Sequence, residues 1–514
     1  MKPTRFIVAF LAFMVVQLVA TQVWAKENAK PNFVFIAIDD MNDWVGYMGG
    51  HSQASTPNLD ELASQGTAFM NAHSVAPGCS PSRNALLYGV EPYNSGLYPF
   101  YDHDIHKSLS QKYTSLPRFL KENGYQTYGA GKIHHGPQYG EQEWSEYFVS
   151  DNVSKRFAEG KGFTDGNSKK SSFRPVTNPL EEMTDHQVAS YGIEVIQREH
   201  EKPYFVAIGL VKPHLPFDCP VEFYDALPEK IESPEILASD LNDIGREANS
   251  MRRAGDDKKF SGNNKWEEVR RNYLACISWV DYNVGRIIDA VESGPDADNT
   301  VVILWSDHGY HMGEKKTFRK FTLWEEASRV PFIIDDRRFS QKGTGKPVEQ
   351  AVTLINVYRT IAELAKLDAP EYVDGVSLVP QLRDPNAPVS IPAISSWGRG
   401  NYTVRTEDWR YIRYFDGAEE LYDHRQDSNE WHNLASSEDH QDTLKELAAM
   451  LPEQEAPTVE EFLAYWSIYG ADKKRLKAEA EAAKENGMAK DKEDKKKAKK
   501  AARKNARKQA AQNT

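Results

Sequence analysis

The sequence predicts an α/β protein in which a mainly parallel central sheet lies between layers of helices. Continuous apolar runs that end in polar residues dominate the first two thirds of the chain, and such runs are typical of strands buried on both faces. They are residues 32–38, 125–130, 204–211, 300–305 and the shorter run 331–334. Helical patterns alternate with these runs, at residues 58–65, 116–123, 184–199, 265–291 and 352–367.

The pattern changes after about residue 385, where apolar and polar residues alternate. Segments 393–397, 402–405 and 409–414 are separated by turn residues, which is typical of a small antiparallel sheet. We therefore expect four parts: a signal peptide (1–25), an α/β catalytic domain (26–385), an antiparallel subdomain (386–470) and a tail (471–514). The polar stretches 155–180 and 229–262 are expected to be long insertions on the binding side of the sheet.

The N-terminus has the features of a secretory signal peptide. Lys2 and Arg5 precede an apolar run over 6–20, and small residues precede a cleavage point near Ala25. An uncleaved anchor is the alternative, because the run is of borderline length. We expect an exported protein, periplasmic or secreted, with no stable membrane insertion after cleavage. In such a compartment Cys219 and Cys276 could pair.

Composition excludes several classes of protein. The chain has 514 residues, 40% of them hydrophobic, and only three cysteines, which excludes a wholly disordered chain and a disulfide scaffold. The net charge is −12, but residues 471–514 hold 16 Lys/Arg and 7 Asp/Glu, so the tail carries +9 and the remainder −21. The tail composition favours a solvated helix or a disordered tail over a nucleic-acid or anionic-surface binder. No nucleic-acid partner is expected.

Chemically reactive side chains follow four of the predicted strands directly, where each strand ends. They are Asp39 and Asp40, then Lys132, His134 and His135, then Lys212 and His214, then Asp307 and His308. In open α/β sheets, ligands bind beyond the carboxyl ends of the strands. Asp also caps helices at such positions, but four reactive endings at one edge predict a functional site there.

These side chains sort into two chemical sets. Asp39, Asp40 and Asp307 are hard oxygen donors, with His308 as a further candidate ligand, and clustered carboxylates repel each other unless a cation lies among them. Oxygen-rich sites select Ca²⁺ or Mg²⁺. The lysines and the other histidines suit an anionic substrate group or proton transfer to a leaving oxygen. The combination suggests a phosphate or sulfate ester as the substrate.

Cys79 is the candidate nucleophile. Ser80 can cap a helix and Pro81 suits its first position, so the sequence places Cys79 just before a helix N-terminus, where anions bind. Arg83 follows within about one turn and can point back toward the thiol. A lone cysteine in an apolar segment is more often buried and inert, but Gly78 and these neighbours favour a functional position.

The segment Cys79-Ser80-Pro81-Ser82-Arg83 matches the Cys-x-Pro-x-Arg core of the type I, formylglycine-dependent sulfatase signature. The chain resembles that family from about residue 31 to residue 434. The stretch 212–217 and the Asp-His pair at 307–308 look most like iduronate-2-sulfatase-like bacterial sulfatases, and the ending 421–431 resembles their C-terminal subdomain. The resemblance implies an alkaline-phosphatase-like fold.

The resemblance also implies the chemistry of the site. Cys79 would be oxidised to formylglycine by a formylglycine-generating or an anaerobic sulfatase-maturing enzyme. The aldehyde hydrate would attack sulfur with one oxygen and expel sulfate through the other. Arg83 and Lys132 would stabilise the nucleophile and the bridging charge. The residues implied to hold one Ca²⁺ per chain are Asp39, Asp40, Cys79, Asp307 and His308.

The remaining site residues are assigned less directly. The common family pattern, Gly-Lys-x-His, points to His134, whereas the iduronate-type pattern points to His135, which we favour. His214 would contact the sulfate and protonate the leaving oxygen, and Lys212 would bind the anionic substrate group. A final sulfate-binding lysine is expected after residue 309. The segment that follows Lys320 matches the family, so Lys320 is preferred to Lys315 and Lys316.

The sequence thus predicts hydrolysis of sulfate esters on a sulfated oligo- or polysaccharide. The alternatives are a phosphoesterase or phosphonate hydrolase of the same superfamily and a non-catalytic sulfated-glycan-binding relative. The iduronate-like features suggest a 2-O-sulfated uronic acid, although related sequences act on algal polysaccharides. Trp44, His103, Arg399 and the insertion 229–262 could shape the sugar pocket.

Overall fold

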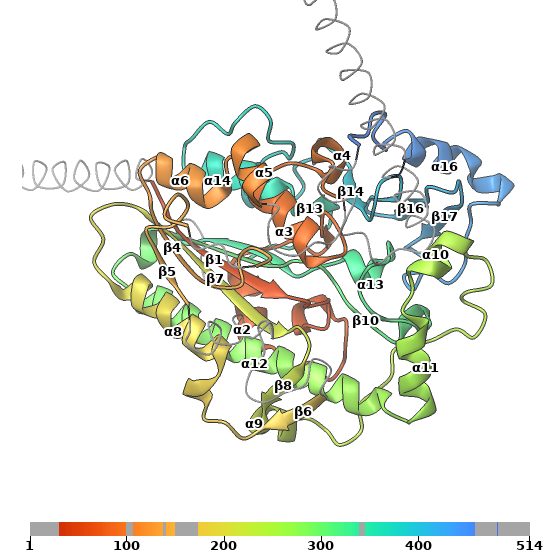
Figure 1. The fold of residues 1–514 in the computed structure, drawn as a ribbon, viewed down its shortest axis with the longest axis horizontal. Helices are drawn as coiled ribbons and strands as arrows, with labels where there is room; N and C mark the ends of the chain where they lie inside the picture. The colour runs from red at the N-terminus through yellow and green to blue at the C-terminus, as the bar shows by residue number, and fades with distance from the viewer. Residues whose placement is uncertain are drawn as a thin grey trace, which may run out of the picture.

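The computed structural model describes residues 30–98, 106–136, 140–149, 173–338, 345–457 and 481, and a seven-stranded sheet forms its centre (Figure 1). In spatial order the strands are β2 (Thr67–Ala68), β12 (Phe332–Asp336), β9 (Thr300–Ser306), β1 (Asn32–Asp39), β7 (Tyr204–Pro213), β4 (Gln126–Gly131) and β5 (Glu146–Phe148). From β9 to β5 all neighbouring strands are parallel. This confirms the predicted mainly parallel sheet.

One predicted direction is wrong. The apolar run 331–334 forms β12, which pairs antiparallel with β9, and Phe332 lies opposite Trp305 at the end of β9. The segment 307–331 leaves the end of β9 and leads back to the same end of that strand, where β12 begins. An antiparallel neighbour can follow without a crossover helix. An apolar run indicates that a strand is buried on both faces, but it does not indicate the direction of that strand.

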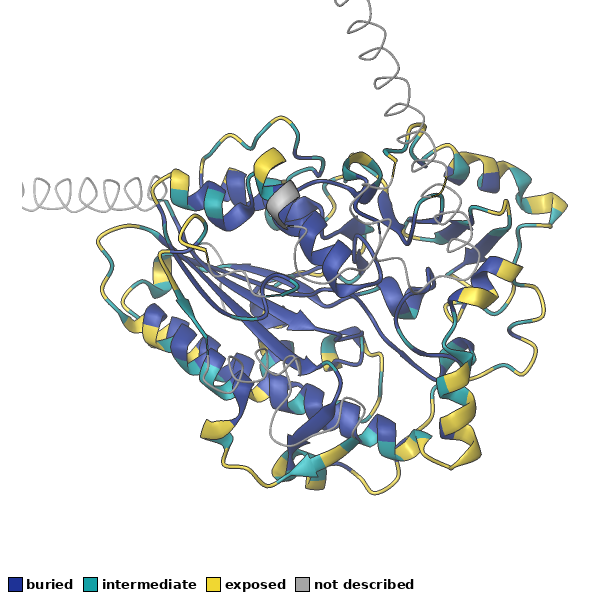
Figure 2. Cartoon of the chain, in the orientation of Figure 1, coloured by how far each residue is buried: buried dark blue, intermediate teal, exposed yellow. Residues whose placement is uncertain are grey.

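Helices cover both faces of the sheet, as predicted (Figures 1 and 2). On one face, alternate residues of β1 such as Ile36 pack with α2 (Pro57–Gln65), α8 (Thr184–Gln197) and α12 (Trp266–Ser293). On the other, Phe35 and its neighbours pack with α3 (Cys79–Tyr88), α6 (Leu116–Glu122) and α14 (Asn356–Leu364). The predicted helix 352–367 starts late because Val352–Thr353 forms β13, paired with β3 (Ala72–His73).

The C-terminal part forms a second sheet, and its predicted antiparallel pairing is confirmed. The strands are β14 (Ala393–Ser396), β15 (Tyr402–Arg405), β16 (Trp409–Arg413) and β17 (Glu419–Asp423), with α16 (Gln441–Ala448) against them. Trp397, which follows β14, stacks on Phe321 at a ring separation of 4.9 Å. The second sheet is therefore joined to the loop that precedes β12.

The remaining elements are short. They are η1 (Gly46–Met48), α4 (Pro92–Ser95), α5 (His106–Lys112), β6 (Phe173–Val176), η2 (Leu180–Glu182), β8 (Phe217–Pro220), α9 (Val221–Asp225), α10 (Arg246–Met251), α11 (Ala254–Gly262), η3 (Ala297–Asn299), β10 (His311–Met312), η4 (Glu314–Lys316), β11 (Phe318–Arg319), α13 (Glu325–Ser328), α15 (Val379–Arg383) and η5 (Glu438–His440). The insertion 229–262 thus contains α10 and α11.

Several predictions fall outside the described residues: the signal peptide, His103, most of the insertion 155–180 and nearly all of the basic tail. Within the described residues, no helix combines the length and the apolar character needed to cross a membrane. Cys219 and Cys276 are buried thiols and are not bridged in this structure.

Candidate active site

Cys79 lies at the N-terminal end of α3, with its thiol fully buried. The helix begins at Cys79 itself, two positions earlier than the sequence suggested, because Gly78 rather than Ser80 adopts the extended N-cap conformation. The Cys79 Sγ atom lies 3.0 Å from Lys320 Nζ and 3.3 Å from His308 Nε2. Burial raises the pKa of the thiol, but Lys132 and Lys320 outweigh it and bring the pKa to about 7. The position therefore stabilises an anion.

Gly78 is needed for close packing at this turn. A Cβ atom at position 78 would lie 2.7 Å from the ring of Trp397. Phe321, whose amide donates to the Pro77 carbonyl, packs beside it. The turn that carries Cys79 is therefore covered by the loop before β12 and by the C-terminal sheet.

Three carboxylates meet beside Cys79. Asp39 ends β1, and Asp40 follows in the left-handed region with φ of 65°. The Asp40 amide donates to Asp307 Oδ1 at 3.0 Å, so the ends of β1 and β9 are joined directly. Burial alone raises the pKa of Asp40, but His214 and Lys320 hold it well below its usual range. Asp40 is therefore an ionised acceptor.

Three side-chain cations offset these carboxylates. Arg83 Nε donates to Asp307 Oδ2 at 2.7 Å, and the same guanidinium lies 3.4 Å from Asp39 Oδ1. Lys132 Nζ lies 2.5 Å from Asp39 Oδ2, and Lys320 Nζ lies 2.5 Å from Asp40 Oδ1. These three cations thus already relieve the repulsion among the carboxylates, so repulsion alone does not require a metal ion at this site.

Four buried residues offer ligand atoms that together could hold a metal ion. One ligand atom from each of Asp39, Asp40, Cys79 and His308 lies within 4.8 Å of the others, and all four residues are buried. His308 Nδ1 lies 2.8 Å from the Gly309 carbonyl, which fixes the ring and directs Nε2 at Asp40. Carboxylate oxygens suit Ca²⁺ or Mg²⁺. Of the five implied ligands, Asp307 lies beside this group and is held mainly by Arg83.

His214 lies at the accessible edge of the site. Its side chain is 34% exposed and its Nε2 is 3.9 Å from Asp40 Oδ2. Its Nδ1 lies 2.6 Å from the Leu215 carbonyl, which can only accept, so Nδ1 carries the proton. Burial lowers the pKa of His214 to about 4, so the ring is neutral near pH 7 with its Nε2 lone pair toward the site.

The three candidate lysines after residue 309 have different surroundings. Only Lys320 of these three contacts Cys79. Lys315 donates to Asp240 Oδ1 at 2.6 Å, and Lys316 donates to the Ala238 carbonyl at 2.9 Å. The structure therefore brings Lys320 into the site and places the other two against the insertion 229–262.

Other predicted site residues are engaged elsewhere. Lys212 is buried and donates from Nζ to the Pro216 carbonyl at 2.6 Å. His134 is buried with Nε2 2.8 Å from Glu143 Oε2, whereas His135 is half-buried. The Glu143 contact gives His134 a carboxylate partner, and the preference for His135 stays a prediction.

The residues proposed to shape a sugar pocket are only partly accessible. Trp44 is buried, with its ring 4.4 Å from that of His51. Arg399 pairs with Glu455 at 3.2 Å.

Two groups that support the site were not predicted from the sequence. Ser306 Oγ accepts from the Met41 amide at 3.0 Å, and the Tyr273 hydroxyl donates to the Asp40 carbonyl at 2.7 Å. Ser306 ends β9, so its place beside the predicted rim could have indicated a role. Tyr273 lies on α12 in an ordinary amphipathic pattern, and no sequence signal distinguishes it from the core.

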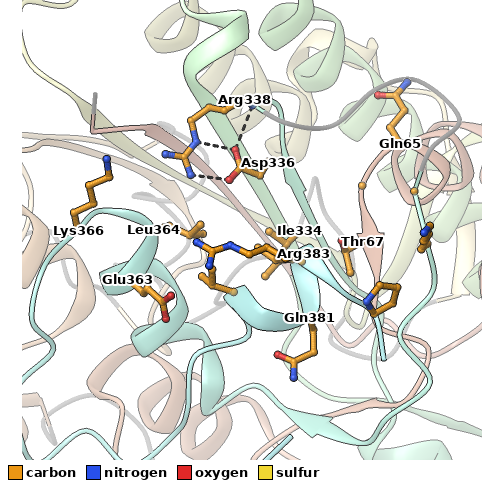
Figure 3. Close-up of a pocket in the computed structure, with 16 residues that line it drawn as sticks. Gln65, Thr67, Ile334, Asp336, Arg338, Glu363, Leu364, Lys366, Gln381 and Arg383 are labelled. Atoms are coloured by element: carbon orange, nitrogen blue, oxygen red, sulfur yellow. Dashed lines mark hydrogen bonds and ion pairs between the residues drawn. The ribbon is translucent and has the colours of Figure 1, made fainter. Parts of the chain in front are cut away.

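A cavity of about 580 Å³ lies elsewhere and is not the reaction site (Figure 3). Its lining includes Ile334, Asp336, Arg338 and Arg383. Asp336 pairs with Val301, near the start of β9, whereas Cys79 and the carboxylates lie at the end of that strand. The cavity therefore lies at the end of the sheet where β9 begins, opposite the end that carries Cys79 and the carboxylates.

Comparisons with known proteins agree with this geometry. The chain matches the model of the sulfatase family over residues 31–367 and that of the N-sulphoglucosamine sulphohydrolase C-terminal region over residues 313–456. A sulfatase of Formosa agariphila is 34% identical over 452 residues, which cover 84% of this chain and 88% of that protein. Iduronate 2-sulfatase of Mus musculus is 27% identical over 392 residues, covering 66% and 69%.

The fold has solved counterparts. One structure, described as a complex with its substrate D-glucosamine-2-N,6-O-disulfate, matches with a TM-score of 0.65 at 20% identity. The match covers 82% of this chain and 97% of that one. The family match spans most of the chain and includes Cys79, the carboxylates and the cations described above. The chain therefore belongs to the sulfatase family, the sulfuric ester hydrolases.

Proposed function

We propose that this sulfatase releases inorganic sulfate from a sulfated oligo- or polysaccharide, using a formylglycine formed from Cys79 and one bound Ca²⁺. The convergence of Lys320, His308 and Asp40 on Cys79 Sγ, at 3.0, 3.3 and 3.6 Å, carries this proposal. An oxygen nucleophile at this position would face an ammonium group and an imidazole. Such groups stabilise negative charge that develops on oxygen during reaction.

Asp39, Asp40 and His308 would hold the metal together with the residue formed from Cys79. When bound, Ca²⁺ would supply a positive charge that polarises the oxygens it contacts. The formylglycine hydrate would supply two oxygens, one to attack sulfur and one to expel sulfate. Arg83 and Lys132 would orient Asp39, because both contact its carboxylate.

His214 would donate the proton to the sugar oxygen as its bond to sulfur breaks. In this structure its Nε2 carries a lone pair, since Nδ1 carries the proton and burial lowers the pKa to about 4. A sulfate ester beside the ring adds negative charge, which favours the imidazolium. His214 would therefore acquire its acidic proton in the substrate complex. Lys320 would bind the sulfate oxygens, and His135 would line the same pocket.

The substrate class is supported by the iduronate-type features of the chain and by its similarity to iduronate 2-sulfatase. We infer that the substrate is a glycan that carries a 2-O-sulfated uronic acid. We also propose that the enzyme is exported. Its parts would be a signal peptide (1–25), a catalytic domain (26–385), an antiparallel subdomain (386–470) and a tail (471–514). The basic residues of the rim explain why a body with a net negative charge can bind an anionic glycan.

Mass spectrometry of the peptide that contains Cys79 tests the nucleophile. In protein from the native host we expect loss of sulfur and gain of an aldehyde oxygen, and an unmodified thiol there would overturn the proposal. Release of sulfate from a panel of defined sulfated oligosaccharides then tests the substrate class. Phosphate or phosphonate ester cleavage exceeding sulfate release would favour the phosphohydrolase alternative. Glycan binding without any release would favour the non-catalytic one.

A further inference from the structure

The turn that carries Asp40 is held from two directions. From the end of β9, Asp307 accepts from the Asp40 amide and Ser306 accepts from the Met41 amide, both at 3.0 Å. From α12, a single hydroxyl, that of Tyr273, contacts both sides of the turn. It donates to the Asp40 carbonyl at 2.7 Å and accepts from the Asn42 amide at 3.0 Å.

Asp40 needs such support because of its backbone conformation. Its φ of 65° lies in the left-handed region, which non-glycine residues occupy at a cost, although Asp tolerates it better than most. That conformation sets the direction in which the Asp40 side chain leaves the backbone, and so the direction of its carboxylate toward His308 and Cys79. A strained residue persists only where its surroundings hold it.

Tyr273 is itself held rigidly. It is fully buried, its ring stacks on Tyr310 at 5.6 Å, and it contacts Phe217 at 5.2 Å. Its hydroxyl position is therefore set by aromatic packing in the core that α12 shares with the sheet. This makes Tyr273 a fixed reference point for the turn, more than 230 residues away in sequence.

We propose that Tyr273 is a positioning residue for the metal site, which presets the Asp40 carboxylate for Ca²⁺ binding before the ion arrives. This rests on the proposed function, because Asp40 is a ligand only if the site binds the ion. Groups that orient a metal ligand typically change metal affinity 10- to 100-fold when removed.

The test is Tyr273→Phe in the full-length, matured enzyme, which keeps the ring and removes the hydroxyl. The matched control is Tyr310→Phe, because the Tyr310 hydroxyl is also buried and has no hydrogen-bond partner among the described residues. Each protein is stripped with a chelator and titrated with CaCl₂ by calorimetry. We expect the Ca²⁺ dissociation constant to rise about 10- to 100-fold in Tyr273→Phe and to change less than about threefold in the control.

Equal Ca²⁺ affinity in wild type and Tyr273→Phe would overturn the inference, and so would an equal loss in both variants. Failure of the wild type to bind Ca²⁺ would instead contradict the proposed function. A second measurement needs no variant. In the stripped wild type, hydrogen exchange of the Asn42 amide should already be slow, because Tyr273 accepts from it without metal. Rapid exchange that slows only after Ca²⁺ is added would show that the site is not preset.

Discussion

Two buried clusters of charged residues in this protein have similar composition but differ in how their side chains are paired. The catalytic cluster consists of Asp39, Asp40 and Asp307 with Arg83, Lys132 and Lys320, beside Cys79 and His308. The interface cluster consists of Glu325, Arg405, Arg410, His424 and Glu430 and joins α13 to the C-terminal sheet. Each contains carboxylates matched by cations, and each brings at least three metal-ligand-type groups together.

Both clusters contain a guanidinium between two carboxylates, since Arg83 contacts Asp39 and Asp307, but only the catalytic cluster adds lysines. In the interface cluster, the guanidinium of Arg410 lies between Glu325 and Glu430, and Arg405 also contacts Glu325 and His424. Planar guanidinium forks satisfy several acceptors at once and fix the geometry. In the catalytic cluster, Lys320, a compact charge on a flexible stem, contacts Asp40 and Cys79. Ligand proximity alone therefore does not identify a reaction site, because a nucleophile is also needed.

The largest expected effect is on chemistry in the catalytic cluster. Cys79→Ala removes the precursor of the nucleophile, so sulfate release should fall by at least about 10³-fold. The melting temperature should stay close to wild type, since only a small side-chain group is lost. Cys219→Ala, which removes a buried thiol outside the cluster, should retain sulfate release per folded molecule. Unchanged release in Cys79→Ala would end the assignment.

The next effect should be on stability in the interface cluster. Arg410→Met leaves Glu325 and Glu430 without their shared partner in a buried environment, which should reduce the free energy of unfolding by about 3–5 kcal/mol. The kcat of the protein that remains folded should be nearly unchanged. Chemical denaturation checks the first point, with Arg425→Met as the control, because the Arg425 side chain is half exposed and its charge is therefore largely solvated. A stable Arg410→Met variant would show that this cluster does not hold the sheet.

Lys320→Ala should have the opposite effect, with a loss of activity rather than of stability. Loss of the ammonium beside Cys79 and Asp40 should reduce kcat/KM about 10²- to 10³-fold, because the charge stabilises the transition state. Lys316→Ala, which removes a lysine that donates to a backbone carbonyl, is the control and should remain within about twofold of wild type. Initial rates on a sulfate ester provide the measurement. Similar rates in the two variants would contradict the choice of Lys320.

The smallest expected effect concerns Glu420 of the C-terminal sheet. Burial raises its pKa from 4.5 to about 7, although Trp324 and Tyr422 donate to it. The unfolded chain therefore loses this proton at lower pH, and Glu420 lowers stability as pH rises from about 4.5 to 7, by at most about 1.4 kcal/mol per pH unit. Melting temperatures of Glu420→Gln and wild type, measured from pH 5 to 8, should diverge in favour of the variant up to about pH 7. Parallel profiles would contradict the raised pKa.

The sequence predicted the parts of the fold that depend on burial. The runs at β1, β4, β7 and β9 mark central strands because both of their faces are covered, and their polar endings meet at one edge. Strand direction was not encoded in the same way, since β12 is as apolar as its neighbours but antiparallel. The predicted ligands converge because strand ends converge. Tyr273 could not be found, because a hydroxyl on a core helix has no local pattern that reports a contact more than 230 residues away.

The cover over Cys79 has a consequence for the order of events during biogenesis. The thiol is fully buried, and the turn before it packs under Trp397, which lies far later in the chain. Under the proposed conversion of Cys79 to formylglycine, a modifying enzyme would have no access to the thiol once the C-terminal sheet is in place. The modification would then have to precede the last folding step, and a chain that completed its fold too early would be inactive although correctly folded.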